Sequence, residues 1–192
     1  MTARVVVMAR YPVPGQCKTR LIPALGAEGA ADLHRRLVEH TLSVVRSSRL
    51  PFTLWGTGAE GAAFTGWLGP LSFQSQAQGD LGARLRAAAP PYPVLFLGTD
   101  APDLQPDYLR QAFRLLEEGK DVLGPAEDGG YWTLGLKAAL PEVFMDMPWG
   151  TDQVAALTKA RMAKAGRQPA LLPTLADLDR PEDLKRWPGL TR

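Results

Sequence analysis

Short apolar runs alternate along this chain with longer amphipathic stretches, and this alternation restricts the fold more than any other feature. The clearest apolar runs cover residues 4–9 and 93–97 and lack the polar alternation of a half-exposed strand. Such runs are typical of strands that are covered on both faces. Amphipathic helices are indicated over residues 28–47 and from about residue 106. Strands that alternate with helices predict a mostly parallel sheet with helices on both faces.

Weaker patterns fill in the remaining elements. Further strands are expected over residues 52–55, 71–74, 121–125 and 131–136, followed by an extended segment over residues 169–178. Further helices are expected over residues 81–89, from a cap at Thr151 or Asp152 to about residue 165, and over residues 181–187. The chain shows no repeat and no linker long enough to separate two domains. We therefore predict a single-domain three-layer α/β/α protein over residues 1–192, with a mostly parallel mixed sheet.

The composition is that of an ordinary globular protein and excludes several classes of function. The chain has 22 Lys and Arg against 20 Asp and Glu, so its net charge of +2 gives no reason to expect nucleic-acid binding. No apolar run approaches the roughly 20 residues of a membrane span, and the first run is too short for a signal peptide. A single cysteine suits a reducing compartment. We expect a cytoplasmic protein without membrane or nucleic-acid partners, and the sequence leaves a homodimer open.

The loop after the first strand carries a glycine and two cations close together. Gly15 lets backbone N–H groups approach an anion, and Lys18 and Arg20 can supply a point charge and a forked donor to phosphate oxygens. The loop lacks the spacing of a P-loop or of a dinucleotide fingerprint. Two interpretations stay open, a phosphate site and a surface loop with solvated cations.

Two aspartates follow the second clear strand. Asp100 comes at the tip of the strand over residues 93–97, where ligands bind in open α/β sheets. A carboxylate at this position suits Mg²⁺ or Mn²⁺, which bridge protein oxygens and substrate phosphate. For Asp100 we favour metal binding. For Asp103 we favour a cap of the following turn or helix.

Two later segments are also acidic. One places Asp128, Gly129 and Gly130 before two aromatic residues. Asp-Gly is the ordinary hairpin signal, but the two glycines would also let a sugar ring lie close to the backbone. In the other segment Asp177 and Asp179 alternate in an extended chain, so they point the same way, and a cation would hold the two carboxylates together. The alternative for Asp179 is a cap of the helix that follows it.

Four other residues have ordinary interpretations. His34 and His40 lie on a predicted helix without a second ligand nearby, so they are expected to be structural. Cys17 is next to Lys18, whose charge would lower the pKa of a nearby thiol, but no Cys-His arrangement supports a nucleophile. Trp149 either lines the ligand crevice or packs in the core or at its rim.

Taken together, these segments resemble the DUF2064 family of bacterial glycosyltransferase-like proteins, which is placed in the nucleotide-diphospho-sugar transferase superfamily. The resemblance runs from near the N-terminus to Leu184, and the order and spacing of its motifs make it specific. It implies the GT-A fold of that superfamily. Cys17, Ala101 and Arg180 depart from the usual pattern without removing a charge that the mechanism needs. The segments that carry the resemblance are 8–15, 18–21, 79–84, 98–104, 124–131 and 177–184.

The resemblance also implies four groups of site residues. Carboxylates would hold a divalent metal, Mg²⁺ or Mn²⁺, and the basic loop would hold the diphosphate. The nucleoside would lie beside residues 78–84, and the donor sugar or the acceptor would face the glycine-rich turn. The implied residues are Asp100 and Asp179 for the metal; Gly15, Lys18 and Arg20 for the diphosphate; Gln78, Asp80, Gly82 and Arg84 for the nucleoside; and Asp128, Gly129, Gly130 and Tyr131 for the donor sugar or acceptor.

The leading hypothesis is transfer of a sugar from a nucleotide-diphosphate donor to an unidentified acceptor. Lys18 and the metal would stabilise charge on the leaving diphosphate, and Asp128 would act as base toward the acceptor hydroxyl. The first alternative is guanylyl or cytidylyl transfer with release of pyrophosphate, because the same fold hosts nucleotidyltransferases and the Lys-Thr-Arg-Leu loop resembles that of phospholactate guanylyltransferases. The second alternative is a nucleotide-sugar-binding protein without turnover.

Overall fold

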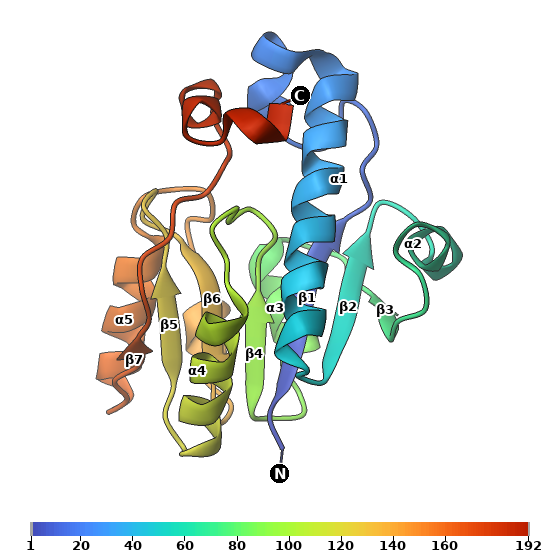
Figure 1. Ribbon diagram of the computed structural model, residues 1–192. Coiled ribbons are helices and arrows are strands. Elements are labelled where there is room, and N and C mark those ends of the chain that lie inside the picture. Colours follow the sequence, from blue (N-terminus) through green and yellow to red (C-terminus); the bar gives the residue numbers. More distant parts are fainter. Residues whose placement is uncertain (1, 192) are drawn as a thin grey trace.

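A seven-stranded mixed sheet with helices on both faces makes up residues 2–191, the part of the chain that the structure, a computed structural model, describes (Figure 1). The strands lie in the order β3-β2-β1-β4-β6-β5-β7. They are β1 (Arg4–Arg10), β2 (Phe52–Thr57), β3 (Phe73–Ser75), β4 (Val94–Leu97), β5 (Val122–Pro125), β6 (Tyr131–Leu136) and β7 (Ala170–Leu171). The α-helices are α1 (Ile22–Ser48), α2 (Gly61–Leu68), α3 (Leu81–Ala88), α4 (Pro106–Glu117) and α5 (Val154–Lys164), and the 3-10 helices are η1 (Thr19–Leu21), η2 (Pro141–Phe144), η3 (Pro181–Arg186) and η4 (Pro188–Thr191).

All strands of the sheet except β6 run in the same direction, so their carboxyl ends lie at one edge. β1 pairs in parallel with β2 and β4. β6 is antiparallel to both of its neighbours, β4 and β5, because a short turn joins β5 directly to β6. Two reversals restore the direction, so β5 runs parallel to β4, and β7 pairs in parallel with β5. The carboxyl ends of β1, β4 and β5 therefore meet at the upper edge in Figure 1, and the predicted mostly parallel mixed sheet is confirmed.

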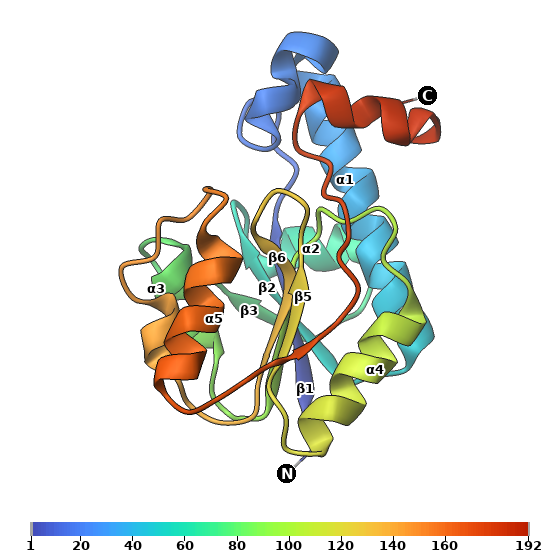
Figure 2. The ribbon, with the colours of Figure 1, turned by 90° about the vertical axis from the view of Figure 1, so that its left-hand side faces the viewer.

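The sheet separates two apolar cores, as Figure 2 shows with α1 and α4 on one side and α3 and α5 on the other. Successive side chains of a strand point to opposite faces. Val5 and Val7 of β1 accordingly lie in the core with Val38 and Leu109, and Val6 lies in the opposite core. This double coverage explains why β1 reads as a continuous apolar run in the sequence.

A third, smaller core lies above the carboxyl edge of the sheet, where the C-terminal segment meets the first half of α1 (Figures 1 and 2). Leu21, Leu33 and Leu37 are buried there together with Leu178. Trp187 packs against the same group from the C-terminal 3-10 helices. This contact carries the acidic segment over residues 177–183 to the loop that follows β1.

Three local expectations differ from the structure. α1 begins at Ile22 rather than near residue 28, and it contains a break at Gly26, whose left-handed φ of 72° interrupts the helical path. The N-cap of α5 is Gln153, while the hydroxyl of Thr151 donates to the carbonyl of Pro148. The C-terminal helices have 3-10 geometry, which is usual for short terminal pieces.

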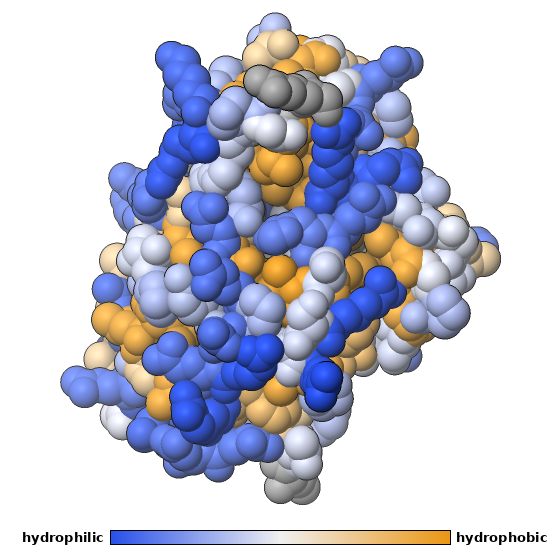
Figure 3. All heavy atoms as spheres, viewed as in Figure 1, coloured by the Kyte–Doolittle hydropathy of each residue, from blue (hydrophilic) through white to orange (hydrophobic). Residues whose placement is uncertain are grey.

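Hydrophilic and hydrophobic residues are intermixed over the face that Figure 3 displays. Among the helices of the described residues, none combines the length and the apolar character that a membrane crossing requires.

Candidate functional site

Two adjoining crevices open at the carboxyl edge of the sheet. One is a cavity of about 260 Å³ with mainly apolar walls, and the other is a more polar crevice of about 500 Å³. Asp128 and Asp177 line both of them, together with Gly150 and Thr151. Asp100 belongs to the first and Asp179, with Arg20, to the second. The acidic residues predicted from three separate sequence segments thus meet around one site.

Lys18 lies between two of these carboxylates. Its Nζ atom is 2.7 Å from Asp100 Oδ1 and 3.5 Å from Asp179 Oδ1. The same atom donates a hydrogen bond of 2.6 Å to the backbone carbonyl of Leu178. The Lys18 side chain is only 4% exposed, so its ammonium group is separated from bulk water and paired on three sides.

The loop after β1 fixes the position of this lysine. The loop turns at Gly15, which has a left-handed φ of 79°, and the carbonyl of Val13 accepts from the N–H of Gln16 at 3.0 Å. Cys17 and Leu21 are both buried on either side of Lys18. Lys18 itself has a φ of 47°, an uncommon value for a residue with a side chain, which the flanking buried residues hold in place.

Charge pairing governs the titration of Lys18 and Asp100. Burial disfavours the ammonium form, but the carboxylates of Asp100, Asp179 and Asp177 outweigh burial, so the pKa of Lys18 is raised. Burial likewise disfavours the Asp100 carboxylate, but the Lys18 ammonium outweighs it and the pKa of Asp100 is lowered. Both groups are therefore charged across the physiological pH range.

The Asp100 side chain is nevertheless 53% exposed, because one of its faces opens into the cavity. The backbone at this position is fixed from the C-terminal side, since the carbonyl of Asp100 accepts from the N–H of Leu178 at 2.8 Å. A charged carboxylate at a strand end is thus held rigidly and remains accessible to a ligand.

Asp179 faces the basic loop rather than the helix that follows it. Its Oδ2 atom accepts from Arg20 Nη1 at 2.6 Å. The capping role belongs to Asp183, whose Oδ2 atom accepts from the N–H groups of Asp179 and Arg180 at 3.0 and 2.7 Å. The cap interpretation of Asp179 is therefore wrong, and the structure brings this carboxylate to Lys18 as well as to Arg20.

The glycine-rich turn is the hairpin that its Asp-Gly signal predicts, and contact of its glycines with a sugar stays a prediction. It joins β5 to β6 as a hairpin, in which Asp128 Oδ1 accepts from the N–H of Gly130 at 2.8 Å. Gly129 is packed so closely that a Cβ atom there would lie 2.1 Å from the carbonyl oxygen of Asp152, and its own carbonyl accepts from Ala155 at 2.9 Å. The turn is therefore locked against the start of α5 while it borders both crevices.

Asp177 is half-buried and lies near three other carboxylates. Burial raises the pKa of Asp177, and the neighbouring carboxylates of Asp128, Asp100 and Asp183 raise it further. Like charges gathered at this density have a net attraction for cations, which a divalent metal or a cationic ligand group would satisfy.

Aromatic residues form the wall of the smaller cavity. Trp132 is fixed by a hydrogen bond of 3.0 Å from its indole N–H to the carbonyl of Pro173. Tyr131 and Trp149 lie with their rings edge to face, 6.5 Å between centroids. The Tyr131 hydroxyl and the Trp149 indole N–H are buried without a hydrogen-bond partner among residues 2–191, and burial strongly raises the pKa of Tyr131. Trp149 lines the cavity and also packs against the core on the α3 and α5 side, so both of its expected places are observed.

The segment expected beside the nucleoside lies next to the cavity through Leu81, which lines it. Asp80 Oδ1 caps α3 by accepting from the N–H of Ala83 at 2.8 Å. Arg84 Nε donates to the carbonyl of Gly79 at 2.9 Å. A Cβ atom at Gly82 would lie 2.2 Å from the carbonyl oxygen of Phe144, so that glycine permits close packing of α3. The role of Gln78, Asp80, Gly82 and Arg84 in nucleotide binding stays a prediction.

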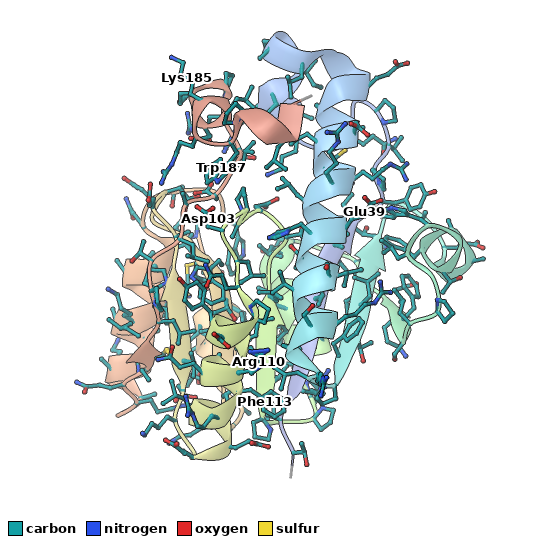
Figure 4. The ribbon with its side chains drawn as sticks, in the orientation of Figure 1. Glu39, Asp103, Arg110, Phe113, Lys185 and Trp187 are labelled. Carbon is teal, nitrogen blue, oxygen red and sulfur yellow. The ribbon has the colours of Figure 1, made fainter. Side chains whose placement is uncertain are left out.

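Two further expectations are corrected by the structure. Asp103 caps neither turn nor helix with its side chain: its Oδ1 atom accepts from the indole N–H of Trp187 at 3.0 Å, and Figure 4 shows the two side chains facing each other. The N-cap of α4 is Gln105. Burial raises the pKa of the Cys17 thiol and outweighs the lowering by the cations of Arg10 and Lys18, so the net shift is opposite to the one expected from the lysine alone.

The histidine expectation agrees with the structure for His34. Its Nε2 atom lies 3.0 Å from the carbonyl oxygen of Arg10, and burial lowers its pKa. It is thus a neutral buried residue that ties α1 to the end of β1.

Some parts of the site are invisible to sequence patterns. The Leu178 carbonyl faces Lys18 as a third oxygen, although a leucine gives no sign of such a role. Arg186 lines the polar crevice and pairs with Glu127 at 2.6 Å. The charged C-terminal segment is the sequence signal that could have indicated Arg186. Its partner could not be predicted, because Glu127 lies 59 residues away.

The donor set partly fits a divalent metal. Within residues 2–191 no group of three or more His, Cys, Asp and Glu side chains is arranged to hold a metal ion. Asp100 Oδ1, Asp179 Oδ1 and the Leu178 carbonyl do converge on one cationic nitrogen, however. Oxygen donors of this kind suit Mg²⁺ or Mn²⁺, which normally complete their coordination with water and substrate phosphate.

The fold is that of the nucleotide-diphospho-sugar transferases, the class named for a solved structure that is 30% identical to this chain. The chain belongs to the DUF2064 family, described as an uncharacterized protein conserved in bacteria, whose model matches residues 41–151. A search of curated proteins gives no match.

Among solved structures, a candidate nucleotide-diphospho-sugar transferase from Desulfovibrio desulfuricans G20 is 30% identical, with a TM-score of 0.86 over 94% of this chain and 84% of that one. A 4-diphosphocytidyl-2C-methyl-D-erythritol synthase from Anaerococcus prevotii DSM 20548 is 10% identical, with a TM-score of 0.61 over 96% and 93%. Glucosyl-3-phosphoglycerate synthase from Mycobacterium tuberculosis, solved with Mn²⁺, UDP and glucosyl-3-phosphoglycerate, is 12% identical, with a TM-score of 0.55 over 100% and 76%. The last two likenesses show the fold alone.

Proposed function

We propose that this protein is a glycosyltransferase that uses a nucleotide-diphosphate sugar together with a divalent metal, Mg²⁺ or Mn²⁺. The observation that carries the proposal is the convergence of Lys18, Asp100 and Asp179 at the carboxyl edge of the sheet, beside the two crevices. The same edge is where open α/β sheets bind ligands. The 30% identical structure from Desulfovibrio desulfuricans, named as a candidate nucleotide-diphospho-sugar transferase, supports the same class of substrate.

The chemistry requires charge stabilisation at the leaving group. When the sugar–oxygen bond of the donor breaks, negative charge develops on the nucleoside diphosphate. Lys18 and Arg20 would neutralise that charge from the basic loop, beside the turn at Gly15. A metal held by Asp100 and Asp179 would supply further positive charge at the same oxygens.

The acceptor needs a base that removes the proton of its hydroxyl group. Asp128 is our candidate, because it borders both crevices from a locked turn. Gly129, Gly130 and Tyr131 would adjoin the donor sugar or the acceptor, and the aromatic wall of the cavity suits the apolar face of a sugar ring. The nucleoside would lie toward Gln78 and the start of α3, where Leu81 reaches the cavity.

A thermal-shift screen tests the proposed substrate class. Nucleoside diphosphates and nucleotide sugars, each with and without Mn²⁺, would be compared on the intact protein. A bound compound at 100 times its dissociation constant adds about 2.7 kcal/mol to the free energy of unfolding, which is an easily measured rise in Tm. The proposal fails if no diphosphate compound raises the melting temperature.

The variant Asp100→Ala sharpens this test. It should abolish the Mn²⁺-dependent part of the shift and lower transfer by at least about 100-fold, because a metal ligand and its held charge are lost. Asp107→Ala is the matched control, since Asp107 is an exposed aspartate on α4 that pairs with Arg110 away from the site. An equal loss in both variants would point to a general effect on stability instead.

Product analysis separates the remaining alternatives. Release of a nucleoside diphosphate from a nucleotide sugar supports glycosyl transfer. Release of pyrophosphate from a nucleoside triphosphate plus a phosphorylated acceptor would instead establish nucleotidyl transfer. Binding without either product, at metal concentrations that saturate the protein, would leave a nucleotide-sugar-binding protein.

A further inference from the structure

The oxygen atoms around Lys18 have the arrangement of a cation site. Nζ lies 2.6 Å from the Leu178 carbonyl oxygen, 2.7 Å from Asp100 Oδ1 and 3.5 Å from Asp179 Oδ1. Carboxylate and carbonyl oxygens are the ligands that Mg²⁺ and Mn²⁺ take from proteins. The lysine ammonium therefore stands where a divalent cation with these ligands would stand.

The fold buries the Lys18 side chain in this position and leaves the Asp100 carboxylate open to the cavity. The Lys18 side chain is 4% exposed, and the buried neighbours Cys17 and Leu21 fix its backbone. The Asp100 side chain is 53% exposed and lines the cavity. A metal can thus reach Asp100 from solvent, but it meets the ammonium of Lys18 once it arrives.

We propose that Lys18 is a built-in competitor of the metal: in the ligand-free protein its ammonium occupies the cation position between Asp100, Asp179 and the Leu178 carbonyl, and it moves to the donor diphosphate when the metal enters. This inference rests on the proposed function for the identity of the metal and of the donor. It adds the order of events at the site, since neither cation can hold the full set of oxygens while the other is present.

Electrostatics gives the consequence for binding. A divalent ion and an ammonium group placed a few ångströms apart repel each other strongly in a crevice of reduced dielectric. A diphosphate brings negative charge that pairs with both cations and removes the repulsion. The metal and the diphosphate should therefore strengthen each other's binding by the same factor, and the metal alone should bind weakly.

Arg20 supplies a matched comparison on the same loop. It also pairs with Asp179, through Oδ2 at 2.6 Å, but its side chain is 52% exposed. Because Arg20 pairs with Oδ2 of Asp179, the other oxygen, Oδ1, stays directed at Lys18 and at the cation position. Removal of Arg20 should thus change the negative charge of the site by the same amount as removal of Lys18 without opening the cation position.

Calorimetric titration with MnCl₂ alone, without any nucleotide, tests the inference. Lys18→Met should bind Mn²⁺ at least about tenfold more tightly than the wild type, and Arg20→Met less than about threefold more tightly. Circular dichroism and thermal melting confirm that each variant is folded. Equal affinity of the wild type and folded Lys18→Met, or an equal gain in both variants, overturns the inference.

A labelling experiment on the wild-type protein covers the case in which Lys18→Met does not fold. Acetylation of individual lysines by a water-soluble ester is followed by peptide mass spectrometry, with Lys120, whose side chain is 54% exposed, as the internal reference. Saturating Mn²⁺ should raise the acetylation rate of Lys18 at least about threefold relative to Lys120. An unchanged ratio overturns the inference.

The proposed function can fail separately. If no nucleotide compound shifts the melting temperature but Lys18→Met gains Mn²⁺ affinity, competition between Lys18 and the metal is supported and the proposed class of substrate is wrong. If nucleotide sugars bind and Lys18→Met gains no affinity, only the competition falls.

Discussion

Two ion pairs in this protein bury a cation against a carboxylate, but they lie at opposite edges of the sheet and differ in their surroundings. Arg167 pairs with Asp121 just before β5 begins, and Lys18 pairs with Asp100 just after β4 ends. The side chains of the first pair are 12% and 1% exposed. In the second pair the lysine is 4% exposed and the aspartate 53%.

The first pair is closed on every side. Arg167 Nε donates to Asp121 Oδ2 at 2.7 Å, and its Nη2 donates to Oδ1 of the same carboxylate. Its remaining donors reach the carbonyls of Ala138 and Ala139, and the N–H of Lys137 donates to Asp121 at 2.9 Å. This bidentate network joins β5, the chain after β6 and the chain after α5, so its role is to hold the fold.

In the second pair the lysine is buried and the aspartate is open to the cavity. Its lysine is fixed by backbone packing, while its aspartate lines a cavity that further carboxylates border. The contrast shows that burial of charge alone does not indicate function. A buried pair in which one partner faces a cavity at the carboxyl ends of strands is the one that a ligand can reach.

The largest predicted effect breaks the closed pair. Arg167→Met leaves the Asp121 carboxylate buried without its partner, which should lower the free energy of unfolding by about 3–5 kcal/mol. Urea denaturation measures the change. Arg167→Lys should recover part of the loss because it restores the charge without the fork. A loss below about 1 kcal/mol would show that the pair is not structural.

A smaller effect concerns the pH dependence beside the open pair. Burial lowers the pKa of His34, which lies near both Lys18 and Asp100. Below about pH 6.5 the histidine binds a proton in the unfolded protein but stays neutral in the folded one. The free energy of unfolding therefore falls as the pH falls, by at most about 1.4 kcal/mol per pH unit. This contribution is fully present above pH 6.5.

His34→Gln removes this titration while the amide can still donate to the carbonyl of Arg10. Denaturation curves between pH 7.5 and about pH 5 should therefore be flatter for the variant than for the wild type. Identical slopes would show that His34 binds its proton equally well in the folded and the unfolded protein, and hence that burial does not lower its pKa.

The smallest predicted effect concerns the exposed pair at the rim of the site. Arg186 and Glu127 have side chains that are 48% and 51% exposed, so water screens their attraction. Arg186→Met should therefore change the midpoint of urea denaturation very little. A loss as large as that of Arg167→Met would mean that the C-terminal segment depends on this pair rather than on its apolar contacts with α1.

Much of the architecture was predictable from local patterns. The strand over residues 93–97 and the helix from Pro106 match β4 and α4 closely, because apolar runs and 3.6-residue periods are properties of neighbouring residues. The sequence does not predict the start of α1, because the break at Gly26 separates the first turn from the rest of the helix. It does not predict the role of Asp103 either, because the partner of that side chain, Trp187, is 84 residues away.

The sequence by itself determined that strands and helices alternate, and that Lys18, Asp100 and Asp128 follow strands or border turns where a ligand could bind. Tertiary structure decided that the ammonium of Lys18 sits among oxygens from Asp100, Asp179 and Leu178. The contact between Lys18 and Leu178 spans 160 residues and depends on the packing of the C-terminal segment against α1. Periodicity reports the neighbours of a residue along the chain, whereas an ion pair depends on distances that only the packed core sets.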